Sequence, residues 1–434
     1  MLRRKFYATL LEWKKRPRKR PLLVKGARQV GKTFIIDRFG RDCYDSYVYL
    51  NFLKNEEHQR IFSGSLDAQT IFSRLSLVVP SARIVPGKTL IFLDEIQECG
   101  NARSALKFLS ESTQVDVVAS GSLLGVQYKE VRSVPVGYEE PVTMGPLDFE
   151  EFLWAKGYPE GIVGDLRKNF EQRTKVDEFV NEKLLAEVRD YMVVGGMPAV
   201  VDAYVHELNY SRVDDLQRGI VDDYLDDILH YAALSEKPKV KNCFLSIPRQ
   251  LARESENRKF KFAEVQKGVG ARKFGNSVEW LRDSSMALMA ENLTVPRLPL
   301  SGYVDEGTYK LYAADIGLLM SMYGLETKAA LLDNRLQGPV KGAIYENLVA
   351  TMLASRGYAL HYYRDRHRPL EVEFLVERDG AVVPVEVKAS NRSTASLDRI
   401  LARDEIGLGY KLVNGNVGVA GKKVTLPHYM ALFV

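Results

Sequence analysis

Residues 26–33 read Gly26-Ala27-Arg28-Gln29-Val30-Gly31-Lys32-Thr33. This stretch matches the pattern G-x-x-x-x-G-K-[ST], with an apolar run at 22–24 before it and another at 34–36 after it. These runs predict a strand and the start of a helix. A loop between a strand and a helix turns its backbone N–H groups toward an anion, and the helix dipole favours negative charge there. The stretch therefore predicts a phosphate-binding loop.

Each position of this loop has an expected task. Gly26 and Gly31 let the backbone wrap around a phosphate without Cβ clashes. Lys32 would reach the β- and γ-phosphates, and the Thr33 hydroxyl would hold Mg²⁺. We therefore expect all eight residues to bind a nucleotide, with ATP and Mg²⁺ as the cofactors.

A second motif supplies the carboxylates that such a site needs. Residues 89–95 read Thr-Leu-Ile-Phe-Leu-Asp-Glu, which predicts a strand buried on both faces and ending in two acids. Asp94 emerges at the carboxyl end of that strand and is the expected Mg²⁺-side ligand. Glu95 is placed to orient or activate a hydrolytic water. The alternative is a strand that simply ends in solvated acids.

Further segments complete an open α/β sheet. Strands are predicted at 47–50, 115–119 and 142–144, and Asp148 is expected to cap a helix that runs to residue 154. Ser120 follows the strand at 115–119, where a small polar side chain could sense the γ-phosphate. Ordinary turn chemistry is the alternative for this serine.

Composition narrows the class of protein. At 434 residues the chain is too long for one core, so two to four domains are expected, and 46% hydrophobic with 27% charged residues is typical of a globular protein. No apolar run approaches the roughly 18 residues of a membrane helix, so no membrane partner is expected. Three scattered cysteines fit a reducing, cytoplasmic compartment. The basic run at 14–20 could contact a nucleic acid or be a solvated surface.

Several motifs together resemble a known family. Besides the loop at 26–33, they are the segments 93–97, 120–125, 146–152, 195–198 and 312–319. They resemble the prokaryotic AAA-type ATPases that carry a C-terminal domain of unknown function, over essentially the whole chain. The resemblance implies an ASCE-type P-loop domain, a winged helix and a restriction-endonuclease-like tail. Many members have a basic residue where this chain reads Val136-Gly137-Tyr138, and no arginine-finger role is transferred to the nearby Arg132.

The expected architecture is therefore α/β with four parts. They are a P-loop ATPase domain at 1–165, a helical linker or lid at 166–235, a winged helix at 236–332 and a PD-(D/E)XK nuclease-like domain at 333–434. The third helix of the winged helix would expose four polar residues suited to a major groove: Arg272, Lys273, Asn276 and Arg282. A plain protein–protein spacer is the alternative use of this unit.

The C-terminal part contains a hairpin signal. Asp379-Gly380 predicts a two-residue turn in which Arg378 pairs with Ala381. The same register places Glu373 opposite Glu386, and two opposed carboxylates repel unless something compensates. A divalent cation, a shared proton and the adjacent Lys388 are the three candidates.

A third carboxylate is expected near this pair. The helix predicted over 342–356 turns Glu346 toward its apolar stripe, where it needs a partner. Glu346, Glu373 and the triplet Glu386-Val387-Lys388 form the PD-(D/E)XK pattern. In that pattern the three carboxylates would hold Mg²⁺, and Lys388 would stabilise charge on a scissile phosphate.

Two departures from the pattern leave the role of this site open. The family usually has Asp where this chain has Glu373, and Ala395 stands where a basic residue often precedes Ser396-Leu397. The main functional hypothesis is an ATPase switch or motor that acts on DNA through its winged helix and nuclease-like tail. The alternative is an ATP-regulated protein-interaction module with a catalytically inactive tail. Assembly into a homo-oligomer is open, and a small-molecule kinase fits poorly because no acceptor pocket is visible.

Overall fold

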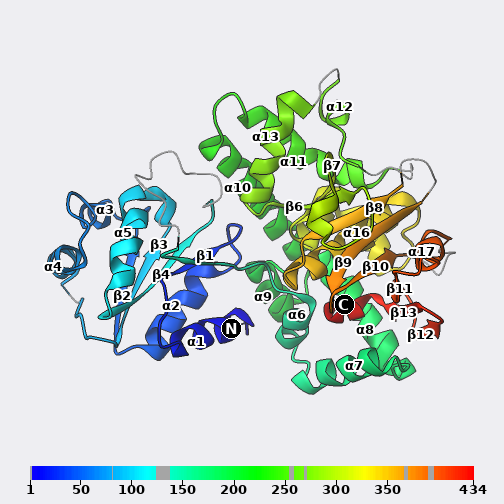
Figure 1. Cartoon of the computed structure of the whole chain (residues 1–434), viewed down its shortest axis with the longest axis horizontal. Helices are drawn as coiled ribbons and strands as arrows, with labels where there is room; N and C mark the ends of the chain where they lie inside the picture. The colour runs from blue at the N-terminus through cyan, green and yellow to red at the C-terminus, as the bar shows by residue number, and fades with distance from the viewer. Residues whose placement is uncertain are drawn as a thin grey trace. The chain divides into compact units, whose positions relative to one another are not determined.

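The computed structural model describes residues 2–80, 82–123, 137–253, 259–267, 271–365, 370–389 and 395–434, and the backbone alone over 271–273. The chain forms two compact units (Figure 1). The N-terminal unit comprises Arg4–Gly145 and Asp283–Ser285, and the C-terminal unit comprises Met1–Arg3, Pro146–Arg282 and Met286–Val434. Each unit is described by itself.

The N-terminal unit is built on a five-stranded sheet in the order β2-β3-β4-β1-β5, in which the four pairs of neighbouring strands are parallel. Its strands are β1 (Leu22–Lys25), β2 (Ser46–Asn51), β3 (Thr89–Asp94), β4 (Val115–Gly121) and β5 (Glu140–Thr143). All six residues of β3 are buried. The sheet confirms the parallel α/β fold predicted from the sequence.

Helices surround this sheet. They are α1 (Phe6–Lys15), α2 (Lys32–Cys43), α3 (Glu57–Arg60), α4 (Ala68–Val78) and α5 (Gly100–Glu111), with a short 3₁₀ turn η1 (Ile96–Glu98) after β3. Alternate strand residues enter one apolar cluster with α4 and α5, for example Ile91 and Leu93 with Ile71 and Leu106. Helix α2 packs on the strands through its own apolar side. A sheet buried on both faces fixes the loops at its carboxyl edge, which is where the acidic and phosphate-binding motifs lie.

The C-terminal unit begins with a run of helices: α6 (Phe149–Ala155), α7 (Glu160–Gln172), α8 (Glu178–Val194), α9 (Pro198–Glu207) and α10 (Tyr210–Tyr231). Asp148 caps α6 with a reciprocal bond to Glu151, as expected. The first predicted domain extended to residue 165, whereas the N-terminal unit ends at Gly145. The reason is that α6 packs on α8 and α9, with the Phe152 ring 5.2 Å from that of Tyr191.

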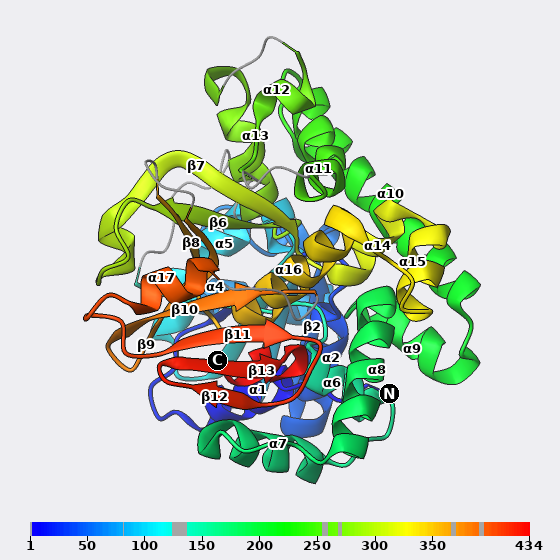
Figure 2. The same ribbon diagram turned by 90° about the vertical axis from the view of Figure 1, so that its right-hand side faces the viewer.

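The rest of this unit combines further helices with one mixed sheet. The helices are α11 (Lys237–Leu251), α12 (Phe262–Val265), α13 (Ala271–Asp283), α14 (Ile316–Tyr323), α15 (Leu325–Leu332), α16 (Gly338–Ser355) and α17 (Ala395–Leu401). The strands are β6 (Ala287–Leu293), β7 (Val304–Ala313), β8 (Leu360–Arg364), β9 (Glu371–Arg378), β10 (Ala381–Val387), β11 (Gly409–Val413), β12 (Gly418–Ala420) and β13 (Lys423–Pro427). Figure 2 shows this sheet, in which the strands run in the order β12-β13-β11-β10-β9-β8-β6-β7.

This eight-stranded sheet crosses the boundary that we expected between residues 332 and 333. Strands β6 and β7 form an antiparallel hairpin, and β6 also pairs in parallel with β8, as Ala290 does with Leu360. That pairing satisfies backbone groups that an isolated hairpin would leave open at its edge. The hairpin and the strands that follow residue 333 therefore belong to one sheet, and the division into two units is coarser than the four parts predicted.

The hairpin register predicted at Asp379-Gly380 is confirmed. Arg378 pairs with Ala381, and Phe374 pairs with Val385. Asp379 and Gly380 have φ values of 51° and 73°, as a type I′ turn requires at both central positions. Within the described residues, no helix is both long and apolar enough to cross a membrane.

Candidate functional site

The phosphate-binding loop connects β1 to α2, as the sequence predicts. Gly26 has φ +148°, and a Cβ atom built there would lie 2.1 Å from the carbonyl oxygen of Met144. Only glycine fits a position with both properties. The guanidinium of Arg4 fixes the same region because it donates to Val30 O at 2.9 Å and to Gly145 O at 2.7 Å.

Lys32 and Thr33 stand at the start of α2 and point to different partners. The Lys32 ammonium is buried and donates to Gly26 O at 2.9 Å and to Ala27 O at 2.8 Å, so it lies within the loop. The Thr33 hydroxyl lies 3.1 Å from Asp94 Oδ2 and 3.3 Å from Oδ1. The structure therefore brings together the threonine and the aspartate that we expected to share a metal ion.

Asp94 is the centre of a hydrogen-bonded cluster at the carboxyl edge of the sheet. The residue is only 2% exposed. Besides Thr33, its carboxylate accepts from three side chains: Tyr49 Oη at 2.9 Å, Asn51 Nδ2 at 3.0 Å and Ser120 Oγ at 2.5 Å. A buried charge is stable only when it is paired or hydrogen-bonded, and four donors meet that need here. We call these five residues the Asp94 cluster.

The sequence analysis missed two members of the Asp94 cluster. Tyr49 and Asn51 are alternate residues of β2, and the parallel register places Asn51 beside Asp94. Burial and the neighbouring charge of Asp94 raise the pKa of Tyr49 to about 12, so its hydroxyl remains a donor. The signal that could have found them is a pair of polar side chains two residues apart at the end of a strand that neighbours β3.

Ser120, which we expected to sense a γ-phosphate, lies beside Asp94. Its side chain is fully buried, and its hydroxyl donates to the Asp94 carboxylate. Its strand, β4, pairs in parallel with β3, which brings the serine next to the aspartate. Its contact with a phosphate stays a prediction.

Glu95, the candidate for activating water, has an unusual backbone. Its φ and ψ values of 54° and 48° lie in the left-handed region, which costs a non-glycine residue free energy. Gln97 donates from Nε2 to Glu95 Oε2 at 2.6 Å. Glu95 directly precedes η1 and Gln97 lies within it, so the turn brings the carboxylate next to the glutamine amide.

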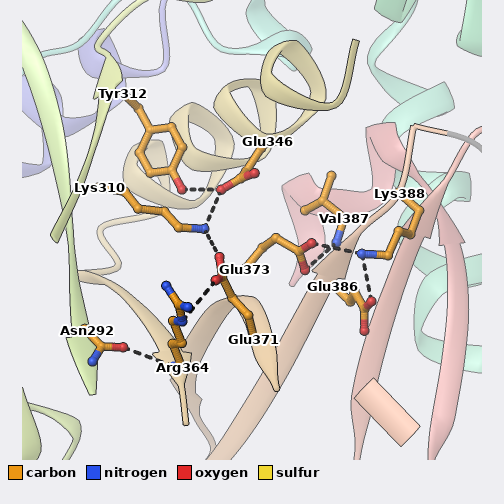
Figure 3. Close-up of polar contacts among 10 residues, drawn as sticks. All are labelled: Asn292, Lys310, Tyr312, Glu346, Arg364, Glu371, Glu373, Glu386, Val387 and Lys388. Atoms are coloured by element: carbon orange, nitrogen blue, oxygen red, sulfur yellow. Dashed lines mark hydrogen bonds and ion pairs between the residues drawn. The ribbon is translucent and has the colours of Figure 1, made fainter. Parts of the chain in front are cut away.

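The expected nuclease-like residues lie around the C-terminal sheet (Figure 3). Glu346, on α16, is buried and accepts from Lys310 Nζ at 2.9 Å and from Tyr312 Oη at 2.7 Å. Lys310 lies 2.8 Å from Glu371 Oε1 as well, and its side chain is 1% exposed. Burial by itself would lower the pKa of Lys310, but the charges of Glu346 and Glu371 outweigh it and raise that pKa above its ordinary value. The lysine therefore stays charged.

Lys388 compensates the repulsion between the carboxylates of Glu373 and Glu386. Its ammonium lies 2.9 Å from Glu373 Oε1 and 2.8 Å from Glu386 Oε1. The backbone N–H of Leu397 donates to the other oxygen of Glu386 at 2.9 Å. Burial raises the pKa of Glu373 to about 7, with Lys388 acting against it and Glu386 reinforcing it. Of the three candidates that the sequence left open, the lysine takes the position between the carboxylates.

The three carboxylates Glu346, Glu373 and Glu386 are not gathered as the Mg²⁺ site that we expected. Over the described ranges there is no group of three or more His, Cys, Asp or Glu residues that could hold a metal ion. The physical reason is that two lysines divide the cluster: Lys310 pairs with Glu346, and Lys388 pairs with the other two. Lys310 comes from β7, in a part of the chain that we did not assign to this domain.

Other basic residues that could contact a nucleic acid are only partly available. In the run at 14–20, Arg16 pairs with Glu140 at 2.6 Å and Lys19 pairs with Asp116 at 2.9 Å. On α13, Asn276 and Arg282 are exposed, but so is Glu279 between them. The side chains of Arg272 and Lys273, and the whole of Arg132, lie outside the described residues.

The sheet order, the loop between β1 and α2 and the Asp94 cluster define a P-loop ATPase. Comparison with known families agrees. Residues 18–153 match the model described as an AAA domain, and residues 185–329 and 341–427 match the models of two domains of unknown function, DUF8612 and DUF4143. The chain thus begins with an AAA-type, ATP-binding P-loop domain, as the resemblance implied, and two C-terminal domains of unknown function follow it.

Individual relatives are distant. An uncharacterized protein of Haemophilus influenzae is 24% identical over 384 residues, which are 84% of this chain and 81% of that protein. Among solved structures, a Walker-type ATPase of Pyrococcus abyssi is 14% identical with a TM-score of 0.44, over 74% of this chain and 96% of the other. The Aeropyrum pernix ORC1 protein, solved in complex with DNA, is 14% identical with a TM-score of 0.28, over 75% and 92%.

Proposed function

We propose that this protein is a Mg²⁺-dependent ATPase that works as a switch, with a C-terminal domain that does not cut DNA. The observation that carries the ATPase part is the Asp94 cluster, in which a buried carboxylate is held by four donors and faces Thr33 of the phosphate-binding loop. So many donors fix the position of the carboxylate. Such preorganisation is what phosphoryl transfer requires of a protein.

The donor set of the site fits Mg²⁺. The Thr33 hydroxyl and the Asp94 carboxylate offer hard oxygen atoms within 3.3 Å of each other, and Mg²⁺ prefers such ligands. When bound, this ion supplies charge neutralisation at the phosphates. Lys32 binds the phosphate oxygens, and the loop N–H groups from 26 to 33 enclose them.

Glu95 gives the site its switch character. As an ordinary general base or water-positioning group, it needs its carboxylate free to reach a water molecule. Its oxygen instead accepts from Gln97 at 2.6 Å, on a left-handed backbone. We infer that this bond restrains the Glu95 carboxylate, so that turnover is slow until a partner or a conformational change releases it.

The test of the ATPase is phosphate release by the purified full chain with ATP and Mg²⁺. We expect Lys32→Ala to abolish turnover and Glu95→Gln to leave ATP binding intact while turnover falls at least about 100-fold. Lys88→Ala is the matched control, because Lys88 forms an exposed ion pair with Asp45. Turnover that survives Lys32→Ala would overturn the assignment of the site.

The contacts of the C-terminal domain favour a catalytically inactive interaction module over a domain that cuts DNA. In a nuclease Lys388 would have to face a scissile phosphate. Here its ammonium is shared between Glu373 and Glu386, at 2.9 and 2.8 Å. We propose that the domain retains a nuclease-like fold as part of an ATP-regulated interaction module.

A plasmid assay separates the two hypotheses. The full chain is incubated with supercoiled DNA and Mg²⁺ or Mn²⁺, with and without ATP, beside Glu386→Ala and Lys388→Ala. We expect no cleavage in any sample. Metal-dependent nicking by the unaltered chain, lost in both variants, would restore a DNA-cutting role.

Two further experiments test whether the protein binds DNA and whether it associates with itself. Fluorescence anisotropy with duplex DNA tests the first, and Arg282→Ala tests whether α13 is involved, since Arg282 is exposed on that helix. Gel filtration with and without ATP tests the second. An ATP-dependent increase in size would add a homo-oligomer to the proposal.

A further inference from the structure

We infer that Lys310 is a built-in cation that takes the position of a divalent metal ion at Glu346. The inference deepens the proposed function, because it rests on a C-terminal domain that does not cut DNA and explains why its carboxylates need no metal. It concerns a residue from β7, outside the part of the sequence in which the nuclease-like pattern lies.

Two carboxylates from different elements of the fold contact the buried ammonium of Lys310. Its ammonium lies 2.9 Å from Glu346 Oε1 and 2.8 Å from Glu371 Oε1, and these carboxylates come from α16 and β9. The ring of Tyr362 is 4.9 Å from the same nitrogen. One buried positive charge thus serves two carboxylates and one aromatic face, which Figure 3 shows for the carboxylates.

A cation bound to the oxygen Oε1 of Glu346 would have to share that oxygen with this ammonium. A Mg²⁺ ion binds carboxylate oxygen at about 2.0–2.1 Å. The oxygen Oε1 of Glu346 already accepts from Lys310 and, at 2.7 Å, from Tyr312 Oη. A metal at Oε1 would displace at least one of two buried donors, which would leave a buried polar group unpaired. A metal at the other oxygen of the same carboxylate would still lie close to the lysine charge and be repelled by it.

Lys310 cannot easily move aside, because β7 is fixed to α16 at successive residues. Lys310 and Tyr312 both bind Glu346. At the next residue, the backbone N–H of Ala313 donates to Asn347 Oδ1 at 2.9 Å, while Asn347 Nδ2 donates to Ala313 O at 3.1 Å. All of these residues are buried. The lysine is thus held at Glu346 by the strand that carries it.

The same geometry predicts what happens when the charge is removed. In Lys310→Met the side chain keeps a similar length but loses its ammonium, so Glu346 and Glu371 lose their shared cation. Repulsion between the carboxylates then favours either protonation or the binding of a divalent ion. Lys310→Arg keeps the positive charge and serves as the matched control.

The experiment measures Mn²⁺ binding to the nucleotide-free full chain by electron paramagnetic resonance. Every sample carries Asp94→Asn so that the nucleotide site contributes no carboxylate at that position. Three proteins are compared, each with and without Glu346→Gln: the chain that retains Lys310, the Lys310→Arg variant and the Lys310→Met variant. We expect the Lys310→Met sample to bind one Mn²⁺ at least about tenfold more tightly than the other two. Adding Glu346→Gln to Lys310→Met should remove the gain.

Two results would overturn the inference. One is Mn²⁺ bound by the chain that retains Lys310 and lost on Glu346→Gln. The other is a folded Lys310→Met variant that gains no Mn²⁺. If circular dichroism shows that Lys310→Met does not fold, the chain that retains Lys310 is measured alone. Absence of Mn²⁺ binding that depends on Glu346 in that chain then supports the inference.

The plasmid assay keeps the two proposals apart. Cleavage without any Mn²⁺ bound at Glu346 would contradict the proposed function only. Mn²⁺ at Glu346 of the chain that retains Lys310, without cleavage, would contradict this inference only.

Discussion

The hydroxyl of Ser120 donates to Asp94 Oδ1 over 2.5 Å, and both residues are buried. This contact joins the ends of β4 and β3, which are neighbours in the N-terminal sheet. A serine that follows a strand is often only part of a turn. Here it holds the carboxylate that is proposed to complete the Mg²⁺ site.

Removing the Ser120 hydroxyl should weaken ATP hydrolysis moderately. Ser120→Ala takes away one of four side-chain donors to Asp94, and one hydrogen bond to a charged group is worth about 1.5–3 kcal/mol. We expect kcat to fall by about 10- to 100-fold in phosphate-release assays. Ser110→Ala is the control, since Ser110 donates to the backbone of its own helix. Unchanged kcat in Ser120→Ala would show that the contact does not serve the reaction.

The two donors from β2 should differ in their effects. Tyr49→Phe removes only a hydroxyl 2.9 Å from Asp94. Asn51→Ala removes a donor to Asp94 and also the acceptor for the backbone N–H groups of Leu53 and Lys54. We expect Asn51→Ala to lower kcat about tenfold more than Tyr49→Phe, because it also releases the following loop. If both variants lower kcat equally in the phosphate-release assay, Asn51 acts only through its hydrogen bond to Asp94 and not through the following loop.

The sequence predicted those features that are set by local chemistry. The loop at 26–33, the buried strand before Asp94 and the register at Asp379-Gly380 each follow from a few adjacent residues. It did not predict the partners of the carboxylates, because these come from distant segments. Tyr49 and Asn51 needed the order of the sheet, and Lys310 needed the pairing of β6 with β8. The opposed glutamates were correctly identified as a conflict of charge, but its resolution by lysines depends on tertiary structure.

Loss of Lys388 should destabilise the C-terminal unit. Lys388→Ala leaves Glu386, which is buried, without its cation, and breaking a buried pair in this way costs about 3–5 kcal/mol. We expect the free energy of unfolding to fall by that amount in urea titrations followed by circular dichroism. Lys423→Ala, which removes an ion pair with the more exposed Asp398, should cost about 1 kcal/mol or less. A Lys388 variant as stable as the Lys423 variant would contradict the ion-pair geometry.

Asp315 should make stability depend on pH. Its carboxylate accepts from the backbone N–H groups of Gly196 at 2.7 Å and Leu318 at 2.9 Å, yet burial raises its pKa from 3.8 to about 6. For an acid whose folded pKa is raised, the stabilisation is present below the unfolded pKa and is lost as pH rises through the folded one. The difference corresponds to about 3 kcal/mol.

The measurement for Asp315 is a comparison with Asp315→Asn, which does not titrate. We expect the stability advantage of the unaltered chain to be largest near pH 4 and to shrink by up to about 3 kcal/mol toward pH 7. At each pH, the free energy of unfolding of the variant is subtracted from that of the unaltered chain. This difference cancels the titration of all other groups that the substitution leaves undisturbed. A difference that stays constant over this range would mean that Asp315 titrates normally in the folded protein.

Gly196 provides a test of close backbone packing in the C-terminal unit. A Cβ atom at this position would lie 2.0 Å from the carbonyl oxygen of Leu147, whose N–H donates to Gly196 O at 2.7 Å. The backbone must therefore shift to admit even alanine, and overpacking of this kind costs about 1–3 kcal/mol or more. Gly219→Ala is the matched control, because a Cβ atom there meets nothing within 4 Å and the residue lies inside α10. Alanine is the better helix former by about 0.5–1 kcal/mol, so Gly219→Ala should stabilise while Gly196→Ala destabilises. In urea unfolding, Gly219→Ala should therefore raise the free energy of unfolding and Gly196→Ala should lower it. Changes of the same sign would contradict the packing of Gly196 on Leu147.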